Sequence, residues 1–146
     1  MRAAIRRLPG TAAAAAGAGR RFYAAGPDVS FGELQRIIHG VRPAAYRLID
    51  VREPHEVAEG RVPTAVNIPL GEVPAAFAMP PDAFAAKYGA ARPGPQDETI
   101  FYCRSGKRSQ SAIDAVEKTD PSLTLRNYRG SWLDYLEHAL GNKALK

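Results

Sequence analysis

The sequence has very little cysteine: Cys103 is the only one in 146 residues. A single cysteine cannot form an internal disulfide, so the fold must be stable without one, as is usual in a reducing compartment. No apolar run approaches the roughly 18 residues that a membrane-spanning helix needs, and we expect a soluble mature protein. The remaining composition, 45% hydrophobic and 24% charged, is typical of one globular domain and excludes a disordered or fibrous chain.

Acidic residues are absent before Asp28, whereas five arginines, at positions 2, 6, 7, 20 and 21, lie there among Ala and Gly. Without these arginines the formal net charge of +5 would be zero. This composition is typical of an organelle transit peptide, and the weakly apolar stretch 12–18 does not suit a secretory signal. The run Arg21-Phe22-Tyr23-Ala24 looks like a mitochondrial processing site. We therefore predict a transit peptide over 1–23 and a mitochondrial location, in the matrix; an Ala-rich tail without a targeting role is the alternative.

The rest of the chain alternates strand-like and helix-like stretches, which favours an α/β fold with helices on both faces of a mostly parallel sheet. Four strands are predicted, at 46–51, 65–68, 98–102 and 122–127, and a fifth is considered near Val29. Helices are predicted at 31–38, 53–59, 108–118 and 131–140, with one or two more between 71 and 94. Ser30 suits the N-cap of the first helix, and Gly40 suits its end.

Cys103 stands between the apolar end of a predicted strand and the first turn of a predicted helix. The loop also contains Gly106, which permits unusual backbone angles, and the cations Arg104, Lys107 and Arg108. Loop amides, the positive end of the helix dipole and these cations would all lower the pKa of the thiol and attract anions. We therefore predict that Cys103 is a reactive thiolate; a small buried hydrophobe at the end of a strand is the alternative.

Four sequence blocks occur in a characteristic order. They are Asp50-Val51-Arg52-Glu53-Pro54 with Glu56, then Gly60-Arg61-Val62-Pro63-Thr64-Ala65-Val66-Asn67-Ile68-Pro69-Leu70, then the cysteine loop, and then Tyr128-Arg129-Gly130-Ser131-Trp132. Together these blocks closely resemble the rhodanese family of sulfurtransferases, and within it the single-domain mitochondrial thiosulfate sulfurtransferases. The resemblance implies a rhodanese-like three-layer fold for a domain over 28–141.

The resemblance also implies a reaction. A sulfane sulfur passes from thiosulfate, or a related persulfide, to the catalytic Cys103, and from the Cys103 persulfide to cyanide, a small thiol or a protein thiol. No general base is needed if the thiol is already ionised. Amides of the loop would stabilise negative charge on sulfur, and its cations would pair with the sulfonate of thiosulfate. The substrate-binding residues implied are Arg104, Ser105, Gly106, Lys107, Arg108 and Ser109.

Three further residues are predicted to lie near the site: Asp50, Arg52 and Trp132. Asp50 and Arg52 end a strand at the edge where open α/β sheets bind ligands. They could orient active-site groups or assist an anion, but an internal salt bridge that fixes loops is the favoured interpretation. Trp132 and Tyr135 are expected as core or rim aromatics that could shape the pocket wall. The histidines, at positions 39, 55 and 138, have no metal-ligand spacing with Cys103 and are expected on the surface.

Two other functions are weighed. Related cell-cycle phosphatases use a larger loop with arginine six positions after the cysteine; that position here is Ser109, so a phosphatase or arsenate reductase is the weaker enzymatic hypothesis. A non-catalytic rhodanese-like interaction module is the other, and the intact Cys103 argues against it. No motif implies a cofactor or a metal. Because the mature net charge is near zero, neither nucleic acid nor a membrane is an expected partner.

Overall fold

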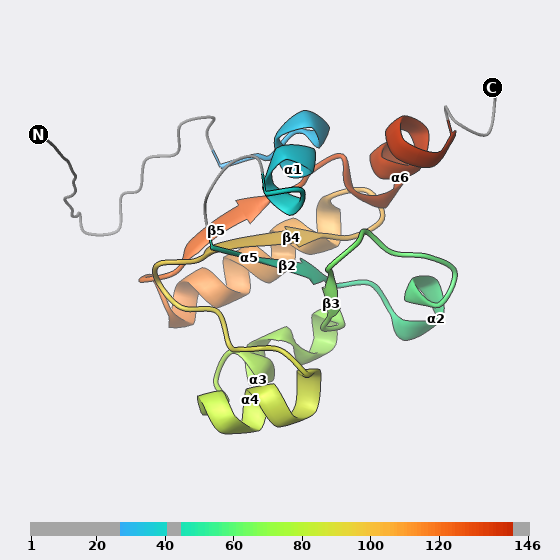
Figure 1. Ribbon diagram of the computed structural model, residues 1–146. Coiled ribbons are helices and arrows are strands. Elements are labelled where there is room, and N and C mark those ends of the chain that lie inside the picture. The colour runs from blue at the N-terminus through green and yellow to red at the C-terminus, as the bar shows by residue number, and fades with distance from the viewer. Residues whose placement is uncertain (1–26, 41–44, 142–146) are drawn as a thin grey trace, which may run out of the picture.

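The computed structural model describes residues 27–40 and 45–141. The predicted transit peptide, residues 1–23, lies outside these ranges. At the centre is a four-stranded parallel sheet with strand order β3-β2-β4-β5 (Figure 1). The strands are β2 (Tyr46–Asp50), β3 (Val66–Asn67), β4 (Glu98–Tyr102) and β5 (Thr124–Asn127). Each lies within a segment that the apolar runs of the sequence predict as a strand.

Helices cover both faces of this sheet (Figure 1). They are α1 (Phe31–Ile38), α2 (Pro54–Val57), α3 (Val73–Ala76), α4 (Pro81–Tyr88), α5 (Lys107–Thr119) and α6 (Ser131–Tyr135), with a 3-10 turn at Leu70–Glu72 and a π-helical segment at Leu136–Gly141. α1 and α6 lie on one face, whereas α3, α4 and α5 lie on the other. This three-layer arrangement confirms the predicted fold class.

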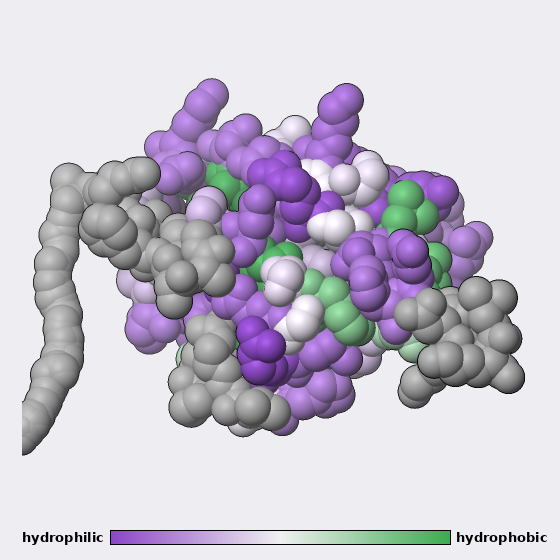
Figure 2. Space-filling view, turned by 90° about the horizontal axis from the view of Figure 1, so that it is seen from above, coloured by the Kyte–Doolittle hydropathy of each residue, from purple (hydrophilic) through white to green (hydrophobic). Residues whose placement is uncertain are grey.

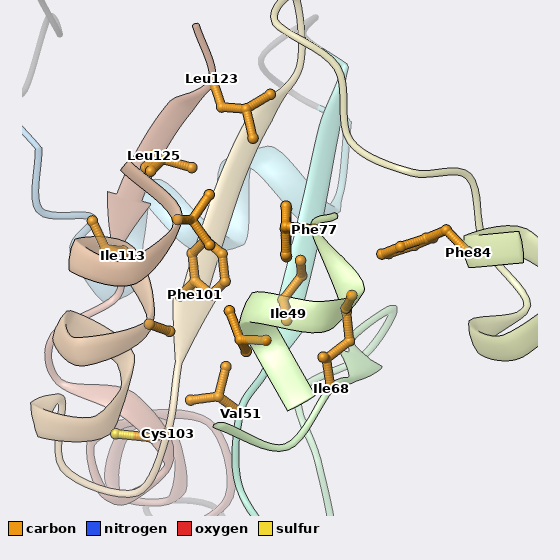
Figure 3. Close-up of a cluster of buried hydrophobic side chains, with 14 residues drawn as sticks. Ile49, Val51, Ile68, Phe77, Phe84, Phe101, Cys103, Ile113, Leu123 and Leu125 are labelled. Carbon is orange, nitrogen blue, oxygen red and sulfur yellow. The ribbon is translucent and has the colours of Figure 1, made fainter. Parts of the chain in front are cut away.

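Each face of the sheet has its own hydrophobic core, because successive strand residues point to opposite faces. Ile49 and Phe101 pack on the side of α3, α4 and α5, whereas Leu48 and Ile100 pack on the side of α1 and α6. Burial on both faces explains the consecutive apolar residues Leu48-Ile49 of β2 and Ile100-Phe101 of β4. Figure 3 shows the first of these cores, with Cys103 at one end of it and its sulfur directed toward α5.

The strand register places the carboxyl ends of the strands at one edge of the sheet. Asp50 pairs with Asn67 on one side and with Tyr102 on the other, and Phe101 pairs with Asn127. Open parallel sheets bind ligands at this edge. The loop that begins with Cys103 follows β4 directly and therefore starts there.

The fifth strand considered near Val29 is reduced to an isolated bridge between Asp28 and Asn127. The Val29 amide donates to the Asn127 carbonyl at 2.8 Å, but Ser30 then caps α1, which begins at Phe31. The Ser30 hydroxyl accepts a hydrogen bond from the Glu33 amide at 3.1 Å, as an N-cap does. The pairing ends because this cap turns the chain away from the sheet.

The predicted helices at 53–59 and 131–140 also differ from the structure. The first is shorter, since α2 ends at Val57 and the chain turns at Gly60 with φ of 146°. The second is α-helical only to Tyr135 and then continues as a π-helix through Gly141. A wider turn replaces the α-helical one in that last segment, and hydrophobic periodicity does not distinguish the two.

The face that carries α1 and α6 is mostly hydrophilic, with hydrophobic side chains showing in between (Figure 2). Leu133 of α6, 43% exposed, is the one large hydrophobic side chain that stands out as exposed within 27–40 and 45–141. No helix in those ranges is long and apolar enough to cross a membrane.

Candidate active site around Cys103

Cys103 is the first residue after β4 and is only 1% exposed. Its amide donates a hydrogen bond to the Ser131 hydroxyl at 3.1 Å, and its carbonyl accepts one from the Trp132 amide at 2.9 Å. The next carbonyl, of Arg104, accepts from the Leu133 amide at 3.2 Å. The start of α6 therefore holds the backbone of the cysteine loop in place.

The sulfur of Cys103 lies among hydrogen-bond donors. The amide of Gly106 points at Sγ from 3.1 Å and that of Ser109 from 3.4 Å, and the Ser109 hydroxyl oxygen is 3.6 Å away. Burial by itself raises the pKa of the thiol, but the Ser109 hydroxyl and the amides of Ser109, Ser105 and Gly106 outweigh it, so the pKa lies below its ordinary value. A buried sulfur in this position can therefore carry negative charge.

Gly106 makes this loop conformation possible. Its φ is 94°, a value that residues other than glycine rarely adopt, and a Cβ at this position would collide with the carbonyl oxygen of Arg129. The absent side chain lets the loop pack against the segment between β5 and α6. In this conformation the Gly106 amide points back at the Cys103 sulfur.

The three cations of the loop have different surroundings. The Arg108 guanidinium makes a two-pronged ion pair with Glu56, with N–O distances of 2.8 and 3.0 Å. Arg108 in turn lowers the pKa of Glu56 to about 2, against the opposing effect of burial. Glu56 raises the pKa of Arg108, to which the nearby Cys103 charge also contributes. Arg104 and Lys107 are exposed to solvent.

Asp50 and Arg52 form a buried ion pair with exposed side-chain fractions of 0% and 2%. The guanidinium donates to both carboxylate oxygens, at 2.7 to 3.2 Å, and to the Gly60 carbonyl at 2.7 Å. It also lies over the ring of Trp132, 4.8 Å from the centre. The favoured interpretation of Asp50 and Arg52 as an internal salt bridge is thus what the geometry gives, and Trp132 is a buried core aromatic.

Two polar residues at this edge were not predicted as site residues. Ser131, fully buried, has φ of 60° and accepts from the Cys103 amide while donating to the Tyr128 carbonyl at 2.9 Å. Asn127, at the end of β5, accepts from the Ser109 hydroxyl at 2.8 Å. The sequence could have indicated Asn127, because it is a polar residue at the end of the buried strand next to the one that leads into Cys103. Nothing local to Ser131 indicates its contact with Cys103, which is 28 residues away.

The three histidines, at positions 39, 55 and 138, are exposed as predicted. His138, in the π-helical segment that follows α6, lies 3.1 Å from the Asp134 carboxylate and stacks on the ring of Phe31, with 5.0 Å between the ring centres. Over 27–40 and 45–141, no three His, Cys, Asp or Glu side chains come close enough together to hold a metal ion.

The fold and the site together define a class of protein. A parallel α/β sheet carries one buried cysteine at the edge formed by the carboxyl ends of its strands, inside a short loop whose amides face the sulfur. Such a loop stabilises anionic sulfur and attracts anionic substrates, which is the chemistry of cysteine-dependent group transfer.

Comparisons with known proteins agree with this class. The model of the Rhodanese-like domain matches residues 30–138. A human thiosulfate:glutathione sulfurtransferase is 38% identical over 115 residues, which are 78% of this chain and 96% of the human protein. A Schizosaccharomyces pombe protein provisionally named as a mitochondrial thiosulfate sulfurtransferase is 40% identical over 88 residues, 60% of this chain and 61% of that protein.

A solved structure, that of the human single-domain sulfurtransferase TSTD1, has a TM-score of 0.70 to this one at 38% sequence identity. The alignment covers 77% of this chain and 96% of the human one. The chain belongs to the rhodanese family.

Proposed function

We propose that this protein is a sulfurtransferase that moves a sulfane sulfur from thiosulfate to a thiol or cyanide through a Cys103 persulfide. The observation that carries the proposal is the Cys103 sulfur 3.1 and 3.4 Å from two loop amides at the ligand-binding edge of the sheet. The names of the human and S. pombe relatives, both sulfurtransferases that use thiosulfate, support it.

The reaction has two steps. The Cys103 thiolate attacks the outer sulfur of thiosulfate; a new S–S bond forms, the old one breaks, and sulfite leaves with the electron pair. An acceptor thiolate or cyanide then attacks the outer sulfur of the persulfide and restores the Cys103 thiolate. Amides of Ser105, Gly106 and Ser109 stabilise the negative sulfur before and after transfer.

The three loop cations have different roles in binding the thiosulfate donor. Arg104 and Lys107 are exposed and free to turn toward the sulfonate of thiosulfate as it enters. Arg108 is held by Glu56 at the rim, so part of its charge is already neutralised. Asp50, Arg52 and Trp132 support the site from within the fold and do not contact the donor.

The acceptor is a thiol with glutathione-like chemistry, a choice that the name of the human relative supports. Cyanide and a protein thiol are further acceptors of the same chemistry. The protein acts in the mitochondrion after loss of residues 1–23, a location supported by the S. pombe name and by the arginine-rich, acid-free start of the chain, and the matrix is the compartment that we propose within it.

A mass measurement tests the reaction. The protein from Ala24 onward is incubated with thiosulfate, and intact mass is expected to show one added sulfur that cyanide removes. Cys103→Ser must not gain it. A stable mass with turnover of an aryl phosphate would make the protein a phosphatase, and a stable mass with tight binding of a partner protein would make it an interaction module. N-terminal sequencing of the endogenous protein tests the targeting; a retained Met1 would refute it.

A further inference from the structure

The sulfur transfer described so far does not involve Asn127, but only the Ser109 hydroxyl separates its side chain from the Cys103 sulfur. It ends β5 and is 2% exposed. Its Oδ1 is 2.8 Å from the Ser109 hydroxyl oxygen, which is itself 3.6 Å from the Cys103 sulfur. Cys103, Ser109 and Asn127 therefore form a buried row of three polar groups.

The orientation of the Asn127 amide follows from its other partners. Its nitrogen donates to the Gly106 carbonyl and to Oε1 of Gln110, both at 3.3 Å. Oε1 of Gln110 also accepts from Arg129 at 3.2 Å, so it is an acceptor. With the amide nitrogen committed to two acceptors, Oδ1 must face Ser109.

This orientation fixes the hydroxyl proton of Ser109. A serine hydroxyl has one proton, and a carbonyl-type oxygen such as Oδ1 can only accept. While Ser109 donates to Asn127, it presents lone pairs to Cys103, an arrangement that suits a thiol because the S–H can donate to them. A thiolate needs the reverse arrangement, in which the hydroxyl turns and donates to sulfur.

We propose that Asn127 is a positioning residue that sets the reactivity of Cys103 through the hydroxyl of Ser109. Asn127 holds the hydroxyl proton while the sulfur is protonated and gives it up when the sulfur becomes an anion. Each ionisation of Cys103 thus costs the hydrogen bond between Ser109 and Asn127 and gains one between Ser109 and the sulfur. The inference rests on the proposed role of the Cys103 thiolate as the sulfur carrier.

The charged groups near the sulfur do not substitute for this exchange, in which the Ser109 hydroxyl donates either to Asn127 or to the sulfur. Arg108 of α5 is paired with Glu56 of α2, and Glu53 is the N-cap of that helix. Asp50, the last residue of β2, is paired with Arg52. Arg104 and Lys107 belong to the loop itself. Arg126 of β5 pairs with Glu33 and Glu98, Arg129 with Asp28, and Asp134 of α6 with Tyr128 and His138. Between Cys103 and Asn127, the side chain that bridges them is the neutral Ser109.

Opposite pKa shifts in two variants test the proposal. The thiol pKa is measured in the full-length chain from the pH dependence of alkylation by iodoacetamide. Ser109→Ala removes the donor to the thiolate and is expected to raise the pKa by about one unit. Asn127→Leu, similar in shape, removes the competing acceptor and is expected to lower it by about half a unit. The double variant is expected to match Ser109→Ala; a clear difference between the two would show that Asn127 acts through its contact with the Gly106 carbonyl instead, and would overturn the proposal.

Ser111→Ala is the matched control, since the hydroxyl of this exposed serine of α5 donates to the Lys107 carbonyl, and the change should leave the thiol pKa unchanged. Thermal unfolding by circular dichroism checks that each variant is folded, and Asn127→Ala replaces Asn127→Leu if the latter is not. A merely structural Asn127 would raise the pKa or leave it unchanged, and either result overturns the proposal. If the wild type takes no sulfur from thiosulfate while the opposite shifts persist, the proposed function fails and this inference does not.

Discussion

Two arginine–carboxylate pairs flank the cysteine loop, and they differ in exposure rather than in geometry. In the inner pair, Arg52 and Asp50 are 2% and 0% exposed; in the rim pair, Arg108 and Glu56 are 33% and 22% exposed. Both pairs are two-pronged, with shortest N–O distances of 2.7 and 2.8 Å. Near-identical contacts thus lie in very different dielectric surroundings.

The difference indicates which charge can take part in binding. Opening the inner pair would leave a buried charge without its counter-ion, so it is a permanent part of the fold. The rim pair is accessible to water and ions, and its separation costs little. The arginine at the rim can therefore respond to a substrate, whereas the inner one cannot.

The largest effect is expected from breaking the inner pair. Asp50→Asn removes the carboxylate and leaves the Arg52 guanidinium buried without a counter-charge, which should lower the free energy of unfolding by about 3–5 kcal/mol. Urea unfolding followed by fluorescence measures the loss. Glu56→Gln, the same change in the rim pair, should cost less, about 1–2 kcal/mol, because solvent screens this pair. Equal losses in the two variants would contradict the distinction between the pairs.

A smaller effect, on binding, is expected from the rim pair. Glu56→Gln removes the charge that neutralises Arg108, so the loop becomes more positive and thiosulfate should bind more tightly. One charge at this distance and exposure corresponds to about 1 kcal/mol, or roughly a fivefold lower KM for thiosulfate. Steady-state kinetics at low and high salt measure the change, which salt should weaken. Glu59→Gln, an equal change of charge at an exposed position of the same segment, should leave KM nearly unaltered.

The smallest effect is expected on the loss of stability at acidic pH. Arg108 lowers the pKa of Glu56 to about 2 in the folded protein, from an ordinary value of 4.5. A lowered pKa means that the contribution to stability is fully present above about 4.5 and is lost as the pH falls toward 2. The stability difference between wild type and Glu56→Gln should therefore be smaller at pH 3 than at pH 6 in urea unfolding. A difference that grows on acidification would show that the pair does not exist in solution.

Much of the fold could be predicted because its signals are local. β2 and β4 each contain a short apolar run, and Ser30 caps α1 within three residues of its own position. The pairing near Val29 could not be predicted, because it depends on β5, almost one hundred residues later. The π-helical end of the last helix has no counterpart in the apolar pattern.

The candidate site divides in the same way. Cys103 and its loop are contiguous, so glycine, cations and the following helix could be read together from the sequence. The partner of Arg108, Glu56, is 52 residues away, and the hydroxyl that accepts from the Cys103 amide is 28 residues away. Such contacts are determined by how the strands align, which single-chain patterns do not specify.

The cysteine loop is anchored at both ends, because α5 follows it directly and the first amides of α6 donate to the carbonyls of Cys103 and Arg104. A loop fixed in this way cannot move outward to meet a sulfur donor or acceptor. The reacting group must therefore be narrow enough to enter the loop and reach Cys103. A small anion such as thiosulfate is narrow enough, and a protein is so only if it extends a single side chain from a protruding loop.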